Sequence, residues 1–165
     1  MKRVVIAAVI SMALPVAAHA ASAVIKSADG QEMGTLNLRQ TGDGVHITGT
    51  IEGLEPGDHA FHIHAVGKCE PPFQSAGGHF NPFNVPHGKI SEGGPHSGDM
   101  NNVTVPDSSP VEIDVINSGV TLNPNGKASL FDADGSAIVF HAGPDDYQSQ
   151  PSGAAGGRVG CGVIQ

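Results

Sequence analysis

Short segments in which apolar and polar residues alternate recur along most of the chain, with turn-forming pairs between them. The pairs include Asp29-Gly30, Asp43-Gly44 and Asp134-Gly135. Alternation of period two places apolar side chains on one face of a strand, and Asp-Gly pairs are typical of tight turns. Glycine (23) and proline (12) together fill 35 of the 165 positions, too many for a helical bundle. The chain is therefore predicted to be all-β.

Eight segments carry this pattern: residues 23–26, 34–39, 45–51, 59–66, 111–116, 127–131, 137–141 and 158–164. Their close spacing favours a single domain built as an antiparallel β-sandwich or flattened barrel. Two stretches rich in Gly, Pro, Asn and Ser, residues 68–102 and 142–157, are predicted to be long loops. Loops of this length in a compact domain are usually functional. Something has to order them, because they hold little apolar surface to bury, and a metal and a disulfide are the candidates.

Residues 1–20 have the layout of a secretory signal peptide. Lys2 and Arg3 precede an apolar run, and Ala18 and Ala20 form an A-x-A cleavage site. The run is too short to span a membrane. We therefore expect cleavage near Ala20, and a mature domain of residues 21–165 without a membrane span that is exported, to the periplasm in a bacterium.

The charge and the cysteine count narrow the partners and the compartment further. Cleavage removes two of the eight basic residues and leaves six against sixteen acidic ones, a formal charge of −10. Such an acidic domain is not expected to bind nucleic acid. The two cysteines, Cys69 and Cys161, favour one structural disulfide in an oxidising compartment, with two free buried thiols as the alternative.

Histidines concentrate in and beside the two long loops. In Phe61-His62-Ile63-His64, the strand period places both imidazoles on one face, close enough to chelate one ion, and His141 at the end of a later strand offers a third. An all-imidazole set on strands suits copper. The loop residues His79, His87, His96 and Asp99 offer three nitrogens and one oxygen, which suits a closed structural zinc site.

Several motifs, quoted as they stand, carry a resemblance to a known family: F-H-I-H, G-G-H-F-N-P, P-H-S-G-D, V-F-H-A-G and G-R-V-G-C-G-V-I-Q. They resemble the Cu/Zn superoxide dismutase family, in particular its exported bacterial branch. The resemblance implies an eight-stranded Greek-key β-barrel and an enzyme that converts superoxide to oxygen and hydrogen peroxide by copper cycling. The chain would act as a monomer or a homodimer.

The resemblance also implies a role for each site residue. His62, His64 and His141 would bind copper, His87, His96 and Asp99 would bind zinc, and His79 would bridge the two metals and donate a proton. Asp145 would tie a copper-ligand histidine to a zinc-ligand histidine, Cys69 and Cys161 would form the disulfide, and Arg158 would dock the superoxide anion. By contrast, His46 and His59 are expected to be ordinary structural histidines.

The sequence departs from the better-known cytosolic pattern in two places. The loop after His141 contains no lysine or glutamate, and the spacing of Cys69 and His79 indicates an insertion. Lys68 and Lys89 are candidates to guide the substrate instead, although an exposed lysine is more often a solubilising charge. Asn102-Val103-Thr104 matches a glycosylation sequon, but an ordinary strand start is favoured.

Two other functions fit parts of the sequence. A non-enzymatic metal carrier on the same fold would be favoured by loss of a copper ligand or of Arg158, and all of these are present. A zinc hydrolase or cupin-like enzyme could use His62-x-His64, but it would need a carboxylate or another ligand directly after the pair, where Ala65, Val66 and Gly67 stand.

Overall fold

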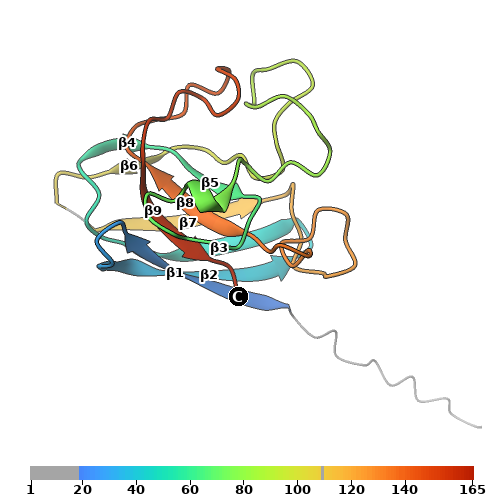
Figure 1. Cartoon of the computed structure of the whole chain (residues 1–165), viewed down its shortest axis with the longest axis horizontal. Helices are drawn as coiled ribbons and strands as arrows, with labels where there is room; N and C mark the ends of the chain where they lie inside the picture. Colours follow the sequence, from blue (N-terminus) through green and yellow to red (C-terminus); the bar gives the residue numbers. More distant parts are fainter. Residues whose placement is uncertain (1–18, 109) are drawn as a thin grey trace, which may run out of the picture.

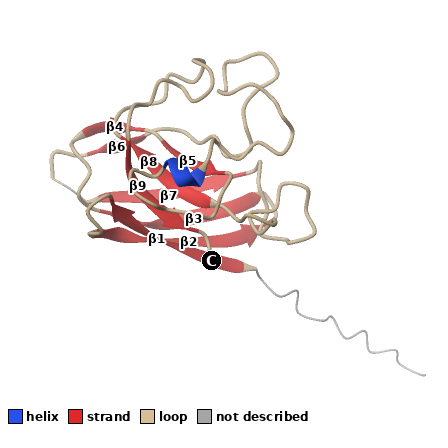
Figure 2. Ribbon diagram, in the orientation of Figure 1, coloured by secondary structure: helices blue, strands red, loops and turns tan. Residues whose placement is uncertain are grey.

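A computed structural model describes residues 19–108 and 110–165, so nearly all of the predicted signal peptide lies outside the described residues. The described chain is almost entirely strand and loop, with one turn of 3₁₀-helix at Gln74–Ala76 (Figure 2). The strands are β1 (Ala20–Ser27), β2 (Glu32–Thr41), β3 (Gly44–Ile51), β4 (Gly57–His59), β5 (Phe61–His64), β6 (Val103–Val105), β7 (Val111–Asn117), β8 (Ala137–His141) and β9 (Arg158–Val163). The prediction of an all-β domain is confirmed.

Seven strands form one curled antiparallel sheet in the order β5-β8-β9-β1-β2-β3-β7, and β4 and β6 form a two-stranded sheet. The chain passes from β7 at one edge of the large sheet to β8 near the other edge, which is a long crossover rather than a hairpin. The order thus combines hairpins with a crossover, as a Greek-key barrel requires. In the part of the chain that the structure describes, no helix has the length and apolarity needed to cross a membrane.

The structure corrects three details of the strand prediction. Residues 127–131 are not a strand, and the only ladder contact of this stretch is an isolated bridge between Thr121 and Ser129. The segment predicted over 59–66 is two strands, because β4 pairs with β6 whereas β5 pairs with β8. The strand β6 has only three residues and is not among the eight predicted segments, although a strand start was favoured at residues 102–104.

The core lies inside the curl of the large sheet. Alternate residues of β1, β2 and β3 point into it, among them Ile25, Leu36 and Ile47, each with no exposed surface. From the strands β5 and β8 of the same sheet, Phe61 and Phe140 also enter this core, and they are cross-strand partners whose rings stack with centroids 5.1 Å apart. Burial of such apolar surface stabilises the fold by roughly 25 cal/mol per Å².

The two long loops lie on the same side of the strands, where they stand next to each other above β5 and β8 (Figure 1). Hydrogen bonds join them, including one from the His87 backbone N–H to Gln150 Oε1 at 2.9 Å. The two loops thus cover one side of the barrel, directly over the strands β5 and β8.

Candidate metal centre

Two clusters of ligand-type side chains lie in the described part of the chain, and they share one residue. The four-histidine cluster consists of His62, His64, His79 and His141, and the mixed cluster consists of His79, His87, His96 and Asp99. Within each cluster, one candidate ligand atom per residue lies within 4.8 Å of all the others. The structure therefore brings together all seven residues that the sequence analysis assigned to metals.

Strand geometry positions the four-histidine cluster. All four residues of β5 are buried, with Phe61 and Ile63 in the core, so His62 and His64 fall on the opposite face beneath the loops. His79 approaches His64 through an isolated antiparallel bridge. A register shift in the β8–β9 ladder after Phe140 sets His141 opposite Arg158. Such bulges commonly re-aim a side chain at a functional site.

The ring nitrogens show whether these clusters fit metal ions. Three buried nitrogens have no hydrogen-bond partner: His62 Nδ1, His79 Nε2 and His141 Nδ1. His87 Nδ1 and His96 Nδ1 are also buried, and they lie near Asp99 without an aligned hydrogen bond to it. In contrast, His62 Nε2 contacts Asp145, His79 Nδ1 contacts Asp99 and His64 Nδ1 donates to the Gly77 carbonyl. A buried nitrogen without a partner is costly unless a ligand satisfies it. The donor set therefore fits one ion per cluster.

Burial keeps three of the cluster histidines in the neutral form that binds metals. Burial lowers the pKa of His64 to about 2, with His79 as a further cause, and burial and His62 lower the pKa of His141 to about 3. Burial also lowers the pKa of His79 to about 4, although the hydrogen bond to Asp99 opposes it. Because metal binding requires neutral imidazole, these rings need lose no proton at neutral pH.

Asp99 stands at the centre of the mixed cluster. Its Oδ1 lies 2.8 Å from His79 Nδ1 and 3.3 Å from His96 Nδ1, and its Oδ2 lies 2.9 Å from His87 Nδ1. The backbone N–H groups of Gly88 and His96 also donate to Oδ2. Burial opposes ionisation, but these donors outweigh it and hold the pKa of Asp99 well below its usual range. An anionic oxygen beside three imidazoles is a donor set of the structural zinc type.

Asp145 links the two clusters, because its carboxylate contacts one histidine of each. Its side chain has no exposed surface, and its carboxylate oxygens lie 2.9 Å from His62 Nε2 and 3.0 Å from His87 Nε2. Burial raises its pKa, but His62, the Tyr147 N–H and His87 outweigh burial and lower it to about 2. The carboxylate is therefore ionised and fixes one nitrogen of each ring, so that the other nitrogen faces its own cluster.

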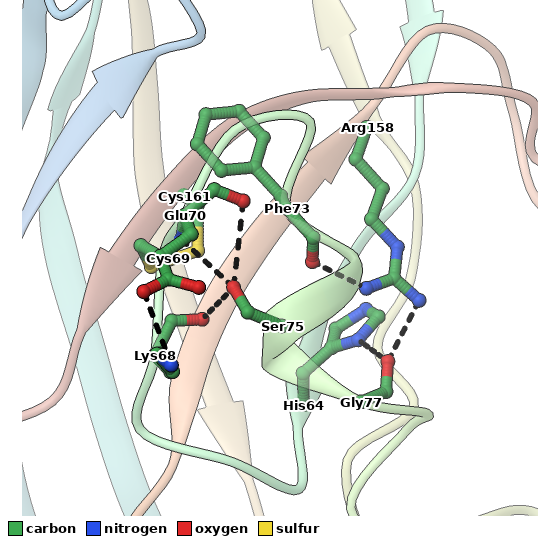
Figure 3. Close-up of a disulfide and its surroundings, with 9 residues drawn as sticks. All are labelled: His64, Lys68, Cys69, Glu70, Phe73, Ser75, Gly77, Arg158 and Cys161. Atoms are coloured by element: carbon green, nitrogen blue, oxygen red, sulfur yellow. Dashed lines mark hydrogen bonds and ion pairs between the residues drawn. A yellow bond between two sulfur atoms is a disulfide. The ribbon is translucent and has the colours of Figure 1, made fainter.

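Arg158 lies beside the four-histidine cluster in a cradle of carbonyl groups. Its Nη1 donates to the Phe73 carbonyl at 2.6 Å and its Nη2 to the Gly77 carbonyl at 2.7 Å (Figure 3). Both carbonyls belong to the segment that follows Cys69, and Cys69 is bonded to Cys161 on β9. The predicted disulfide is thus confirmed, and no cysteine is free.

The remaining candidates lie outside the clusters. Lys68 forms a surface ion pair with Glu70 at 3.1 Å, and the Lys89 ammonium donates to Asn101 and lies 3.8 Å from the centre of the Tyr147 ring. His46 pairs with the exposed Asp114. His59 is buried between the carbonyls of Glu55 and His141.

Some residues that hold the site gave little or no signal in the sequence. The Phe73 and Gly77 carbonyls act through the backbone, which leaves no trace in side-chain identity. Gln150 was not singled out, and Asn102 was noted only as a sequon. The Asn102 amide donates to the Asp145 carbonyl at 2.9 Å and the residue directly precedes β6, which agrees with an ordinary strand start.

The fold and the two joined clusters define an antiparallel β-barrel protein built to hold two metal ions. The copper/zinc superoxide dismutase (SODC) family matches residues 32–164. The Cu-Zn superoxide dismutase 1 of Aquifex aeolicus (strain VF5) is 49% identical over 138 residues, which cover 82% of each chain. The Cu-Zn superoxide dismutase 2 of the same organism is 46% identical over 147 residues, or 88% of this chain and 86% of that protein.

A solved structure shows the same similarity in three dimensions. The crystal structure of a SOD-like protein from Bacillus subtilis superposes with a TM-score of 0.84 at 33% identity, over 87% of this chain and 97% of that one. The chain belongs to the copper/zinc superoxide dismutase family.

Proposed function

We propose that this chain is an exported superoxide dismutase that converts two superoxide anions and two protons to oxygen and hydrogen peroxide. His62, His64, His79 and His141 hold copper, and His79, His87, His96 and Asp99 hold zinc. The observation that carries the proposal is the joint presence of both complete clusters and a cradled arginine beside the four-histidine cluster. A metal carrier has no need of an anion-docking residue at that place.

Copper, when bound, supplies one-electron redox chemistry, whereas zinc has none. Arg158 binds the anion, because a guanidinium is always charged and has five N–H donors, of which the two carbonyl contacts use only part. Its place opposite His141 keeps the anion beside the copper ligands. The protein is acidic overall, but a local positive charge in a site outweighs distant, screened charge.

His79 supplies a proton. Its Nε2 is buried without a hydrogen-bond partner, and its Nδ1 is held by Asp99. Whenever no metal holds Nε2, this nitrogen can take a proton from water, and burial makes that proton easy to give up again, because burial lowers the pKa of His79. His79 can therefore pass this proton to a reduced oxygen species. Arg158 and His79 are thus the two catalytic residues of the proposal.

The hydrolase alternative lacks a base. The carboxylate nearest to His62 is Asp145, and its two oxygens are occupied by His62 and His87. A carboxylate held in this way orients ligands and is not free to activate water.

The proposed location is the periplasm or another exported compartment. The disulfide supports it, because such bonds persist in oxidising compartments. The signal peptide, with cleavage near Ala20, is a prediction from the sequence. The assembly as a monomer or a homodimer is likewise a prediction.

Metal analysis of the mature chain tests the proposed metal sites. We expect one copper and one zinc per chain, and His141→Ala should lose copper while it keeps zinc. His46→Ala is the matched control, because His46 lies outside both clusters and pairs only with surface groups. Zinc alone in the wild-type chain, or copper binding that His141→Ala leaves unchanged, would argue against the proposal.

A further inference from the structure

A side-chain amide from one long loop forms two hydrogen bonds with the backbone of a residue in the other loop. Asn102, at the end of the first loop, accepts a hydrogen bond from the Asp145 N–H at 2.9 Å and donates one to the Asp145 carbonyl at 2.9 Å. Its own backbone N–H donates to the Tyr147 hydroxyl at 2.9 Å. Because the strand β6 begins at the next residue, Asn102 is tied to the barrel. Asp145 is thus held at its backbone as well as at its carboxylate.

Gln150 makes the converse contact from the second loop. Its Oε1 accepts from the His87 N–H at 2.9 Å, and its Nε2 donates to the His87 carbonyl at 2.9 Å. Nε2 also donates to the Gln148 carbonyl at 3.0 Å, which holds the amide plane in place. His87 is thus clasped at its backbone by a side chain from the opposite loop.

The two residues that are held at their backbones also contact each other. These residues, His87 and Asp145, are joined by the hydrogen bond between His87 Nε2 and Asp145 Oδ1 at 3.0 Å. Four amide hydrogen bonds between the loops therefore surround a single bond between the carboxylate and the imidazole. We call this arrangement of Asn102, Asp145, His87 and Gln150 the crossed clasp. None of its hydrogen bonds needs a metal ion.

We propose that Asn102 and Gln150 are positioning residues that lock the two loops together before metal binds, so that the zinc site is preorganised. Ordering long loops rich in Gly and Pro costs conformational entropy. The hydrogen bonds of the crossed clasp offset this entropy cost during folding. Zinc binding then does not have to offset it, so the affinity for zinc is higher than in a chain whose loops become ordered only when zinc binds. The inference rests on the proposed zinc ligands, but its first test is made without metal and without an activity assay.

Amide hydrogen exchange of the metal-free mature chain tests the lock directly. In the wild-type chain, we expect residues 87–99 and 143–150 to be protected. Either Gln150→Ala or Asn102→Ala should speed exchange in both segments, roughly tenfold or more, because each clasp contributes two hydrogen bonds. Strands β1 to β3 should keep their protection, which shows that the variants fold. Gln148→Ala and Asn101→Ala are the matched controls from the same loops, and they should exchange like the wild type.

Zinc affinity provides the second measurement, with a chromophoric chelator as the competitor. Gln150→Met keeps the length of the side chain but removes both hydrogen bonds, so it should weaken zinc binding about as much as Gln150→Ala, by roughly tenfold. Fast exchange of both segments in the metal-free wild-type chain would overturn the proposal. So would an effect of Gln150→Ala confined to its own loop, or wild-type zinc affinity in both variants. These outcomes do not depend on whether the loaded protein decomposes superoxide.

Discussion

Arg158 and His64 donate to the same carbonyl oxygen, that of Gly77, from Nη2 at 2.7 Å and from Nδ1 at 3.0 Å (Figure 3). One residue is the proposed docking group and the other a proposed copper ligand. The shared carbonyl belongs to the segment that the disulfide anchors at Cys69. Movement of this segment would therefore displace the docking charge and a metal ligand together.

Replacing Arg158 tests its docking role. Arg158→Ala should lower the bimolecular rate with superoxide by roughly tenfold or more, equivalent to at least about 1.4 kcal/mol, with unchanged metal content. Lys should restore part of the rate, because it returns the charge but not the planar fork, and Glu should be worse than Ala. Added salt should slow the wild type more than the Ala variant. Equal rates for Arg and Ala at low salt, with full copper in both, would refute docking.

Reducing the disulfide should lower stability and activity together. The bond joins residues 92 positions apart, and a loop of about 100 residues corresponds to a stabilisation of up to roughly 4–5 kcal/mol. Activity should fall because the Phe73 and Gly77 carbonyls lose their anchor. Urea unfolding and superoxide decay, measured before and after reduction, check both effects. Two free thiols found by mass spectrometry in the active exported protein would show that the bond has no such role.

Gly153 is the residue that makes room for the contact between Asp145 and His87. A Cβ atom there would lie 1.8 Å from Asp145 Oδ1 and 2.8 Å from His87 Nε2, and the residue has φ +69°. Gly153→Ala should therefore weaken zinc binding and cost about 1–3 kcal/mol of stability. Gly157→Ala is the control in the same loop, because its Cβ would meet nothing within 4 Å. Chelator competition and thermal unfolding provide the measurements, and wild-type values for Gly153→Ala would exclude this role.

The metal-free chain should lose stability in acid. His64, His79 and His141 have pKa values of about 2, 4 and 3 in the folded protein, against 6.5 for a free side chain. Above pH 6.5 both states are neutral, so these groups do not affect stability. As the pH falls below 6.5, the unfolded chain binds protons that the folded chain excludes, and stability drops by roughly 1 kcal/mol per pH unit for each group. The decline continues until the pH passes the folded pKa values.

Urea unfolding of the metal-free protein between pH 7.5 and 4 measures this decline. Zinc and copper should suppress it, because bound nitrogens cannot take up protons. A metal-free chain equally stable at pH 7 and pH 5 would contradict the assignment of these rings as buried and neutral.

The residues of the site could be predicted from the sequence better than the ends of the strands could. The spacing of His62 and His64 predicted their shared face, because period two is a local property of a strand. Residues 127–131 show where the reasoning failed. Leu130 is fully buried, so the alternation does reflect packing. However, the segment folds back on Thr121 through two backbone hydrogen bonds, and no neighbouring strand continues the ladder.

Contacts between distant segments could not be predicted from the residues alone. The register shift that sets His141 opposite Arg158 depends on how β8 and β9 pair, and β6 is too short to show alternation. The crossed clasp depends on Gln150 meeting a residue 63 positions away. A lone glutamine or asparagine in a polar loop has no pattern that distinguishes it from its neighbours.

Superoxide decay after pulse radiolysis tests the central claim most directly. We predict that the mature chain loaded with one copper and one zinc consumes many equivalents of superoxide per chain, and that the same chain loaded with zinc alone does not. If the chain loaded with both metals left the decay no faster than the zinc-only form, it would not be a dismutase.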